Sequence, residues 1–461
     1  MHALSGRLTD ALFSTEAALA IWSPENTVQG MLDVEAALTH ASAAAGVVPA
    51  SAVAPIAAAC KAEQLDLPAL AMAAALAGNL AIPLVKQLTA RVQAQDEQAA
   101  KFVHWGATSQ DIIDTGLVLQ CRATLDLLGG LLASLSAALA RQAQAHRATP
   151  MVGRTWLQQA LPITLGLKFA QWLDAALRHR QRLAEIRQRV CMLQFGGAAG
   201  TLASLGAQAP AVARGLADAL GLGLPDVPWH SQRDRIAELA GLFGLVIGSM
   251  GKIARDVSLM MQTEIGELAE PAAAGKGGSS TMPHKRNPVG SAAVLAAAVR
   301  APGLVATVFA GMVQEHERAL GGWQAEWEAL PDLARLACGA VSQISGIVEG
   351  LEVDVARLSR NLDLTHGLIL GEAVTLALGE TIGRLDAHHL VEQASKQALV
   401  SGRGLLDVLS ADARVTQHLS QQALAQLLTP ANYVGQSAPF VDAVLSHYAA
   451  SQTAPHGNHG A

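Results

Sequence analysis

The sequence is poor in aromatic residues, and this shortage restricts how its core can be built. Aromatic residues make up only 3% of the 461 residues, whereas apolar residues as a whole make up 51%. Alanine and leucine must therefore supply most of the core. Because both are strong helix formers, the composition predicts closely packed helices. A chain of this length has room for two to four domains with an ample buried surface.

Cysteine is also scarce, which excludes a disulfide framework and a cysteine-based zinc site. The cysteines lie far apart, and none belongs to a Cys-X-X-Cys or Cys/His cluster; they are Cys60, Cys121, Cys191 and Cys338. Such isolated cysteines favour a reducing, cytoplasmic location. Two histidines within residues 455–461 are more typical of a frayed terminus than of a metal site. We therefore expect no metal and no other cofactor.

The charge pattern lacks a basic stripe and a secretory signal. The net charge is −6 and both signs are interspersed, so nucleic acid and an anionic membrane are poor partners. Arg7, Asp10 and Glu16 interrupt the N-terminal region, which excludes the apolar segment of a secretory signal. The long apolar stretch at residues 239–251 is too short to span a bilayer, and we interpret it as part of a buried bundle helix.

Helical patterns divide the chain into three predicted domains. Residues 1–111 carry medium-length patterns broken by prolines, which predict a helical N-terminal domain. Residues 112–363 contain long helical patterns, and residues 364–461 return to shorter helices. We found no strand alternation. Because apolar residues surround much of each long helix, we expect other subunits to complete a central bundle. The long patterns cover residues 112–148, 160–195, 232–267, 289–318 and 331–360.

One loop carries the densest set of chemically active side chains. Residues 278–288 read Gly-Ser-Ser-Thr-Met-Pro-His-Lys-Arg-Asn-Pro and follow two further glycines, Gly275 and Gly277. Hydroxyls, an imidazole and cations behind glycines are suited to a mobile loop that closes on an anion. A helix start would by itself explain Asn287 as N-cap and Pro288 as first helical residue. The candidate site residues of this loop are Ser279, Ser280, Met282, His284, Lys285 and Asn287.

A second segment, residues 104–111, reads His-Trp-Gly-Ala-Thr-Ser-Gln-Asp before a long helix. Thr108 and Asp111 have the spacing of a capping box, which would explain them as a helix start alone. The free N–H groups of a helix N-terminus with hydroxyls beside them also form a natural carboxylate cradle. Capping does not explain a histidine just before the cap. We therefore predict that His104, Thr108 and Ser109 bind substrate.

Two further segments complete the set. Residues 153–159 read Gly-Arg-Thr-Trp-Leu-Gln-Gln ahead of a helix expected to begin near Pro162, and residues 196–201 read Gly-Gly-Ala-Ala-Gly-Thr. The glycine-rich run alone indicates a tight turn as readily as a site. No strand precedes it and no Gly-Lys-Ser/Thr follows, so it is not a nucleotide-phosphate loop. The candidates in the first of these segments are Arg154, Thr155, Trp156 and Gln158.

Together the four segments resemble the fumarase/aspartase superfamily, whose members form or break a bond beta to a carboxylate. The resemblance runs from about Trp22 to Tyr433. It implies an all-α, three-domain fold with a central long-helix bundle, assembled as a homotetramer whose active sites draw on three subunits. It further implies that Ser279 is the catalytic serine, assisted by His284 or His104, and that Lys285 and Asn287 hold the substrate carboxylate.

Such a site has to solve an acidity problem. Removing a proton alpha to an ionised carboxylate places a second negative charge on that group, as an aci-carboxylate. Catalysis then depends mainly on fixed N–H groups, hydroxyls and a cation in a dry cavity. The same positive field could lower the pKa of a serine enough for it to act as acid or base.

Trp156 reduces the number of reactions that this site is expected to catalyse. In the superfamily this position usually holds a histidine that acts as general acid or relay, but an indole N–H cannot transfer a proton near neutral pH. A reaction in which the substrate's own ionised carboxylate adds to carbon needs no such acid. The residues here resemble the cycloisomerase branch, which closes a carboxylated muconate into a lactone.

Two more stretches resemble that branch, residues 316–327 and residues 361–369. Arg318 is the residue we single out, because a tricarboxylate substrate needs cations and arginine binds carboxylates bidentately. His366 stands where an arginine is expected, which leaves a carboxylate contact there in doubt. Trp323 and Trp327 could instead form a helix-packing ridge, and the pair His388–His389 a solvated surface.

Two alternatives differ in their chemistry. The adenylosuccinate lyase branch shares the Met-Pro-His-Lys-Arg-Asn-Pro run, but it must protonate a purine amine, for which Trp156 offers no acid. A catalytically silent structural protein, as occurs in the lens, would be expected to lose the loop hydroxyl, whereas Ser279 is present.

Overall fold

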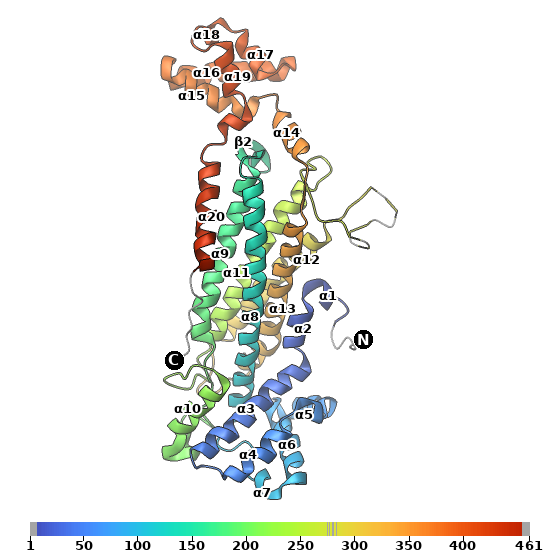
Figure 1. Ribbon diagram of the computed structural model, residues 1–461, viewed down its shortest axis with the longest axis vertical. Coiled ribbons are helices and arrows are strands. Elements are labelled where there is room, and N and C mark those ends of the chain that lie inside the picture. Colours follow the sequence, from blue (N-terminus) through green and yellow to red (C-terminus); the bar gives the residue numbers. More distant parts are fainter. Residues whose placement is uncertain (1–6, 274, 276, 279–280, 283, 454–461) are drawn as a thin grey trace. The chain divides into compact units, whose positions relative to one another are not determined.

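The computed structural model describes residues 7–273, 275, 277–278, 281–282 and 284–453. Helices dominate it, which confirms the predicted all-α fold class. The long helical patterns are confirmed as helices, with ends that differ by up to about two turns in the first four and by about three turns in the last, predicted at residues 331–360 (Figure 1). These helices are α8 (Ser109–Ala145), α9 (Leu165–Val190), α11 (Asp234–Met260), α12 (Val289–Ala310) and α13 (Gly322–Glu349).

Contacts divide the chain into two compact units. Unit 1 comprises Met1–Ala133, His179–Lys252 and Ala292–Ile344, and unit 2 comprises Ser134–Arg178, Ile253–Ser291 and Ser345–Ala461. The boundaries fall inside the long helices, so each of these helices contributes residues to both units. The three domains predicted from the sequence divide the chain after residues 111 and 363 instead. That division stays a prediction.

In unit 1, helices pack on α3 around an apolar cluster. Ser23 caps α3 by accepting a hydrogen bond from the Asn26 N–H (3.1 Å), and Pro24 occupies the first turn. The cluster contains buried residues of α3 and α6 together with Trp323. The shorter elements are α1 (Asp10–Phe13), α2 (Glu16–Ile21), α3 (Pro24–Ala44), η1 (Ala50–Ala52), α4 (Val53–Ala59), η2 (Ala62–Gln64), α5 (Leu67–Ala77), α6 (Ala81–Gln95), α7 (Glu97–Ala100), η3 (Ala203–Gln208) and α10 (Ala209–Leu220).

In unit 2, the helices α15 to α19 gather around a second apolar cluster (Figure 1). Two short antiparallel sheets accompany them. The elements are β1 (Pro150–Thr155), β2 (Gln158–Thr164), β3 (Leu268–Ala269), β4 (Glu352–Val353), α14 (Val355–Asp363), η4 (Leu368–Leu370), α15 (Gly371–Ile382), α16 (Arg384–Ser401), α17 (Leu405–Ser410), α18 (Ala413–Thr416), α19 (Gln421–Leu427), η5 (Pro430–Tyr433) and α20 (Ser437–Thr453).

The hairpin β1–β2 corrects the prediction for residues 153–164. Instead of a helix from about Pro162, strand β2 runs through Pro162 to Thr164, and α9 begins at Leu165. Thr155 pairs with Gln158, so Trp156 and Leu157 form a two-residue turn. Gly153 is needed beside it, because a Cβ there would lie 2.8 Å from the Leu161 carbonyl oxygen. The absence of strands predicted from the sequence is therefore wrong at this place.

Three helices are apolar enough to raise the question of a membrane. Among the described residues, α8, α11 and α12 are each long and apolar enough to cross a bilayer by length and composition, and the bent pair of α14 with η4–α15 would make a fourth span. In α11, 61% of the most apolar window is buried within the chain, but in α12 only 28% is. The exposed face of α12 must therefore be covered by something outside this chain or remain open to solvent.

Candidate active site

The N-terminus of α8 shows one half of the predicted capping box, the contact made by the Asp111 side chain. The Asp111 carboxylate accepts a hydrogen bond from the Thr108 N–H (3.0 Å), and the Asp111 N–H donates to the Thr108 carbonyl (3.0 Å). Thr108 and Ser109 are half-buried at this helix start. Both hydroxyl residues thus lie at the helix N-terminus, as predicted, and whether they bind substrate stays a prediction.

Asp111 also fastens the glycine-rich turn to α8. Its two carboxylate oxygens accept hydrogen bonds from the Gly196 N–H and the Gly197 N–H (both 2.9 Å), and Oδ1 lies 2.7 Å from Nε2 of His230. Asp111 is 1% exposed, and a buried carboxylate is tolerated only when such donors surround it. Segments 104–111 and 196–201 are therefore joined in unit 1.

Arg318 reaches the same place from another part of the chain. Its Nε–H donates to the Gln110 side-chain oxygen (3.2 Å), and its Nη2–H donates to the Ala198 carbonyl (3.1 Å). The side chain is otherwise exposed. The guanidinium is thus oriented from two sides while most of its five N–H donors stay available, as a carboxylate-binding arginine requires.

A buried ion network lies beneath this region. Arg233 forms bidentate hydrogen bonds with Asp114 (2.7 and 3.1 Å) and with Glu326 (3.0 and 2.6 Å), and all three side chains are fully buried. Burial lowers the pKa of Arg233, but the two carboxylates raise it by a larger amount. Arg233 therefore keeps its positive charge. Burial raises the pKa of Glu326 despite the arginine. Gln110 and Trp323 also donate to Asp114, at 3.0 Å each.

His104 has a partner that the sequence did not indicate. Its Nδ1 lies 2.6 Å from Oε1 of Glu35, which is fully buried in the middle of α3. Burial lowers the pKa of His104, but the charge and hydrogen bond of Glu35, with the charge of Asp111, raise it above its ordinary value. Residues 104–111 also pack on the glycine-rich turn, since a Cβ on Gly197 would lie 3.3 Å from the Gly106 carbonyl oxygen.

In unit 2, Arg154 anchors the β1–β2 hairpin. Its guanidinium donates two hydrogen bonds to Glu267 (2.9 and 2.6 Å), and Asn361 donates to the same carboxylate (2.7 Å). Glu267 is fully buried. In this state Arg154 holds the hairpin in place, and its predicted contact with substrate is not tested. At the hairpin tip, Thr155 and Gln158 are exposed, and Trp156 is 97% exposed.

The signature loop is described only in part. Ser279 and Ser280 lie outside the described residues, so their predicted roles rest on the sequence. Met282, His284 and Lys285 are exposed within the chain, and Asn287 is half-buried. The Asn287 N–H donates to the Gly277 carbonyl (2.8 Å), which closes the base of the loop.

The helix start after this loop differs from the prediction. Helix α12 begins at Val289, and Glu270 caps it by accepting hydrogen bonds from the Gly290 N–H (3.1 Å) and the Ser291 N–H (2.8 Å). The assignment of Asn287 as N-cap is therefore corrected, because a buried carboxylate from another segment satisfies those donors. Arg286 pairs with Glu352 across the loop base (2.8 Å).

Backbone strain coincides with the predicted segments. In the described part of the chain, a positive φ at a non-glycine residue occurs at His104, Trp156, Leu157, Leu202, His316 and His366. Each of these residues lies in, or directly after, a segment that the sequence singled out. Such conformations cost of order 1–3 kcal/mol each and cluster at functional sites. The positions of these strained residues thus agree with the segments that the sequence singled out.

Other candidates have simpler roles. The Trp323 and Trp327 rings pack edge to face with centroids 4.9 Å apart, as the packing-ridge interpretation predicted. His388 and His389 are exposed on α16, and His366 is exposed as well. Burial raises the pKa of Cys60 to about 12, so its thiol is unreactive. Within the described ranges, no group of three or more His, Cys, Asp or Glu side chains could hold a metal ion.

The sequence missed the partners of the predicted residues. These partners, Glu35, His230, Gln110 and Glu267, are buried, and each contacts a segment far away in the chain. An acid such as Glu35 on the apolar face of a helical pattern is the available signal, since a charge is rarely buried without a partner. The signal does not say which residue the partner is.

The predicted site residues fall into both units. Unit 1 contains His104, Thr108, Ser109 and Arg318, and it brings their segments together through Asp111 and Gln110. Unit 2 contains Arg154, Thr155, Trp156, Gln158 and the loop residues.

Comparison with known proteins identifies the family. A family described as "Lyase" matches residues 10–303, and one described as "Adenylosuccinate lyase C-terminus" matches residues 367–444. A 3-carboxy-cis,cis-muconate cycloisomerase of Pseudomonas aeruginosa is 58% identical over 452 residues, which cover 98% of each chain. A nitrosuccinate lyase of Streptomyces davaonensis is 41% identical over 446 residues, covering 95% of this chain and 94% of that one.

A solved structure agrees with these relatives. The 3-carboxy-cis,cis-muconate lactonizing enzyme of Pseudomonas putida superposes with a TM-score of 0.93 at 53% identity, covering 97% of this chain and all of that one. The chain therefore belongs to the lyase family of the fumarase/aspartase superfamily.

Proposed function

We propose that this protein is a 3-carboxy-cis,cis-muconate cycloisomerase, which converts its substrate to 4-carboxymuconolactone in the protocatechuate branch of the beta-ketoadipate pathway. The observation that carries the proposal is full-length similarity at 58% identity to a relative of that name. Trp156 supports it from the chemistry, because the position lacks the general acid that an amine leaving group needs. The adenylosuccinate lyase alternative is not favoured.

The reaction requires one new C–O bond and one proton. A carboxylate oxygen of the substrate attacks the diene carbon, and the π electrons of the broken C=C bond move into a neighbouring carboxylate to form an aci-carboxylate. The carbon alpha to that group then takes a proton, which completes the lactone. Because the attacking carboxylate is already ionised at neutral pH, no second proton is needed.

The side chains divide this work between anion binding and proton transfer. Ser279 is our candidate for the proton donor to carbon, with Lys285 and Asn287 binding the carboxylate that becomes the dianion. Arg318 binds a second carboxylate through its fork, since Gln110 and Ala198 already orient it. The cradle of Thr108 and Ser109 at the α8 N-terminus offers further donors. Ser280 and Met282 complete the loop side of the site, and Thr155, Trp156 and Gln158 the hairpin side.

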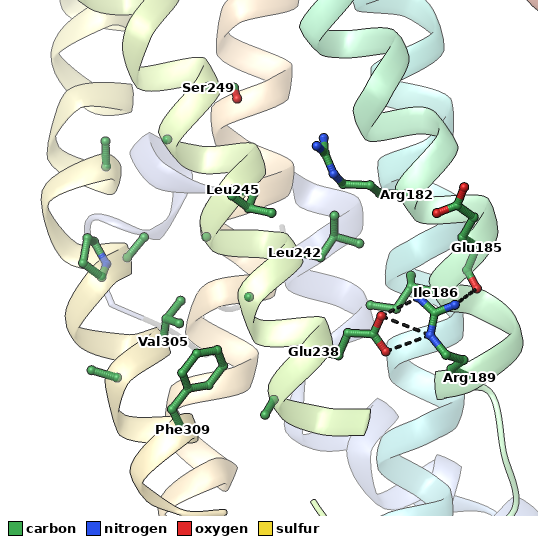
Figure 2. Close-up of a pocket in the computed structure, with 18 of the residues that line it drawn as sticks. Arg182, Glu185, Ile186, Arg189, Glu238, Leu242, Leu245, Ser249, Val305 and Phe309 are labelled. Atoms are coloured by element: carbon green, nitrogen blue, oxygen red, sulfur yellow. Dashed lines mark hydrogen bonds and ion pairs between the residues drawn. The ribbon is translucent and has the colours of Figure 1, made fainter. Parts of the chain in front are cut away.

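We further propose a cytoplasmic homotetramer whose active sites combine segments from three subunits. An open groove of about 1020 Å³ lies along α9, α11 and α12 in unit 1 (Figure 2). Apolar side chains such as Leu242, Leu245, Val305 and Phe309 line it, and the Arg189–Glu238 ion pair borders it. Val299, in the middle of α12, and Val313, just after its end, are 80% and 86% exposed. A helix of another subunit would cover these surfaces.

A direct assay tests the reaction. Purified protein is expected to remove the ultraviolet absorbance of 3-carboxy-cis,cis-muconate, and Ser279→Ala is expected to lower the rate about a hundredfold or more, the cost of losing one key transition-state contact. Ser401→Ala on the exposed end of α16 serves as control and should keep the full rate. Turnover of adenylosuccinate without turnover of the muconate would overturn the proposal, and a fully active Ser279→Ala variant would remove the proposed acid.

A further inference from the structure

Glu35 is a buried acid that no part of the proposed reaction yet uses. It lies in the middle of α3 and is 0% exposed. Its Oε1 contacts His104, whereas its Oε2 has no hydrogen-bond partner among the described residues. Removing a carboxylate from water costs several kcal/mol unless a charged partner offsets it. In the described structure, His104 is the partner that can carry the opposite charge.

His104 is held in a conformation that serves this contact. Its φ is +61°, which is unfavourable for a residue with a Cβ. Nδ1 faces Glu35, and the side chain is 20% exposed. Because Nδ1 is occupied on the buried side, the opposite edge with Nε2 is the part that can face a ligand. The strained backbone and the ion pair together fix that direction.

The surroundings favour a protonated imidazole. Burial lowers the pKa of His104, but the charge of Glu35, its hydrogen bond and the charge of Asp111 outweigh it and raise the pKa. The other titratable group that contacts Asp111 is His230, and the group influenced by Glu35 is the Cys60 thiol, which burial keeps protonated. No cation other than His104 is paired with Glu35 in the described part of the chain.

We propose that Glu35 is a positioning residue that keeps His104 as a fixed cation, whose Nε2–H binds a carboxylate of the substrate. This inference rests on the proposed function, because it gives His104 a role at the same site. A histidine that keeps its proton stabilises the tricarboxylate and the dianionic intermediate by charge, and it does not deliver the proton to carbon. The role of acid then stays with the signature loop.

The two roles predict different kinetics. Loss of a charge that binds ground state and intermediate alike raises KM and leaves kcat nearly unchanged, whereas loss of a proton donor lowers kcat. A hydrogen bond to a charged group is worth about 1.5–3 kcal/mol, which corresponds to roughly 10- to 100-fold in affinity. We therefore expect His104→Gln and Glu35→Gln each to raise KM by about that factor.

The pH profile gives a readout that a purely structural role would not move. In Glu35→Gln the pKa of His104 should fall, because burial remains and the neighbouring charge is gone. The basic limb of kcat/KM should then shift to lower pH. Glu35→Asp keeps the charge and should restore part of the wild-type profile. The double variant Glu35→Gln/His104→Gln should be no worse than His104→Gln alone, since both changes remove one interaction.

Controls separate this inference from folding and from the proposed function. Asp33→Asn removes the same charge from an exposed position on α3 and should leave KM and the pH profile unchanged. NMR titration of 13C-labelled histidine, assigned with His104→Gln, measures the pKa of His104 without substrate. An unchanged KM and pH limb in folded Glu35→Gln would overturn the inference, as would a loss of kcat alone in His104→Gln. Wild-type protein inactive on the muconate would overturn the proposed function instead, while the titration would still report on the ion pair.

Discussion

At the scale of single residues, Arg318 is oriented by its neighbours in the absence of a ligand. Gln110 and the Ala198 carbonyl each accept a hydrogen bond from one of its N–H groups. A preoriented fork loses little freedom when it binds a carboxylate, which is the advantage of arginine over lysine at such a position. Gln110 in turn donates to Asp114 in the buried network. The orientation of the Arg318 guanidinium group thus depends on helix α8.

This arrangement predicts the effect of a conservative change. Arg318→Lys keeps the charge but loses the fork and the contact with Gln110, so we expect kcat/KM for the muconate to fall about 10- to 100-fold. Steady-state kinetics measure this, with Arg384→Lys on exposed α16 as the matched control. A variant with wild-type kcat/KM would show that Arg318 does not bind a substrate carboxylate.

At the scale of elements, α8, α11 and α13 are joined by the buried network of Asp114, Arg233 and Glu326. Two carboxylates share one arginine without access to water. Burial, with a smaller contribution from the charge of Asp114, raises the pKa of Glu326 although Arg233 lowers it. Such a network adds little net stability compared with apolar packing, but it is costly to break.

The network gives a stability prediction. Arg233→Met would leave two buried carboxylates without a cation, and we expect the free energy of unfolding to fall by about 3–5 kcal/mol. Urea denaturation at a fixed subunit concentration measures it, because oligomer stability depends on concentration. Arg214→Met at an exposed position of α10 should change little. Replacing Asp114 and Glu326 by Asn and Gln in the same variant should recover part of the loss; a small effect of Arg233→Met would contradict the argument.

The β1–β2 hairpin shows why the sequence does not predict the bounds of every helix and strand. Two-residue hairpin turns with positive φ at both positions usually contain Asn-Gly or Asp-Gly. Here the turn is Trp156-Leu157, with φ of 52° and 64°, so the usual turn signal is missing. Arg154 anchors the strand to Glu267 instead. A contact between residues 113 positions apart leaves no local pattern.

At the scale of the whole molecule, α11 presents glycines both to α12 and to an open groove. A Cβ on Gly244 would lie 2.9 Å from Val305, and one on Gly251 would lie 2.8 Å from Ala298, so these glycines let α12 approach closely. Gly248, between them, meets nothing within 4 Å. Gly248 instead lines the open groove along α9, α11 and α12.

Gly248 therefore tests the proposed assembly. Gly248→Leu should not disturb the fold of one subunit, because the space is open and leucine favours helix more than glycine does. If a helix of another subunit fills the groove, the new side chain blocks it, and light scattering after size exclusion should show smaller species with loss of activity. Gln397→Leu on exposed α16 is the control. A tetramer that persists in Gly248→Leu would show that this groove is not a subunit contact.

The sequence by itself determined the helical class, the approximate positions of the long helices, the segments that carry chemistry and the superfamily. These follow from local periodicity, helix-forming composition and short motifs, which nearby residues express on their own. Only the tertiary structure decided the partners: Glu35 for His104 over 69 positions, Asp111 for the Gly196 N–H over 85, and Glu267 for Arg154 over 113. Such pairs depend on how distant helices pack and on the need to neutralise each buried charge. The residues next to each partner in the sequence determine neither of these conditions.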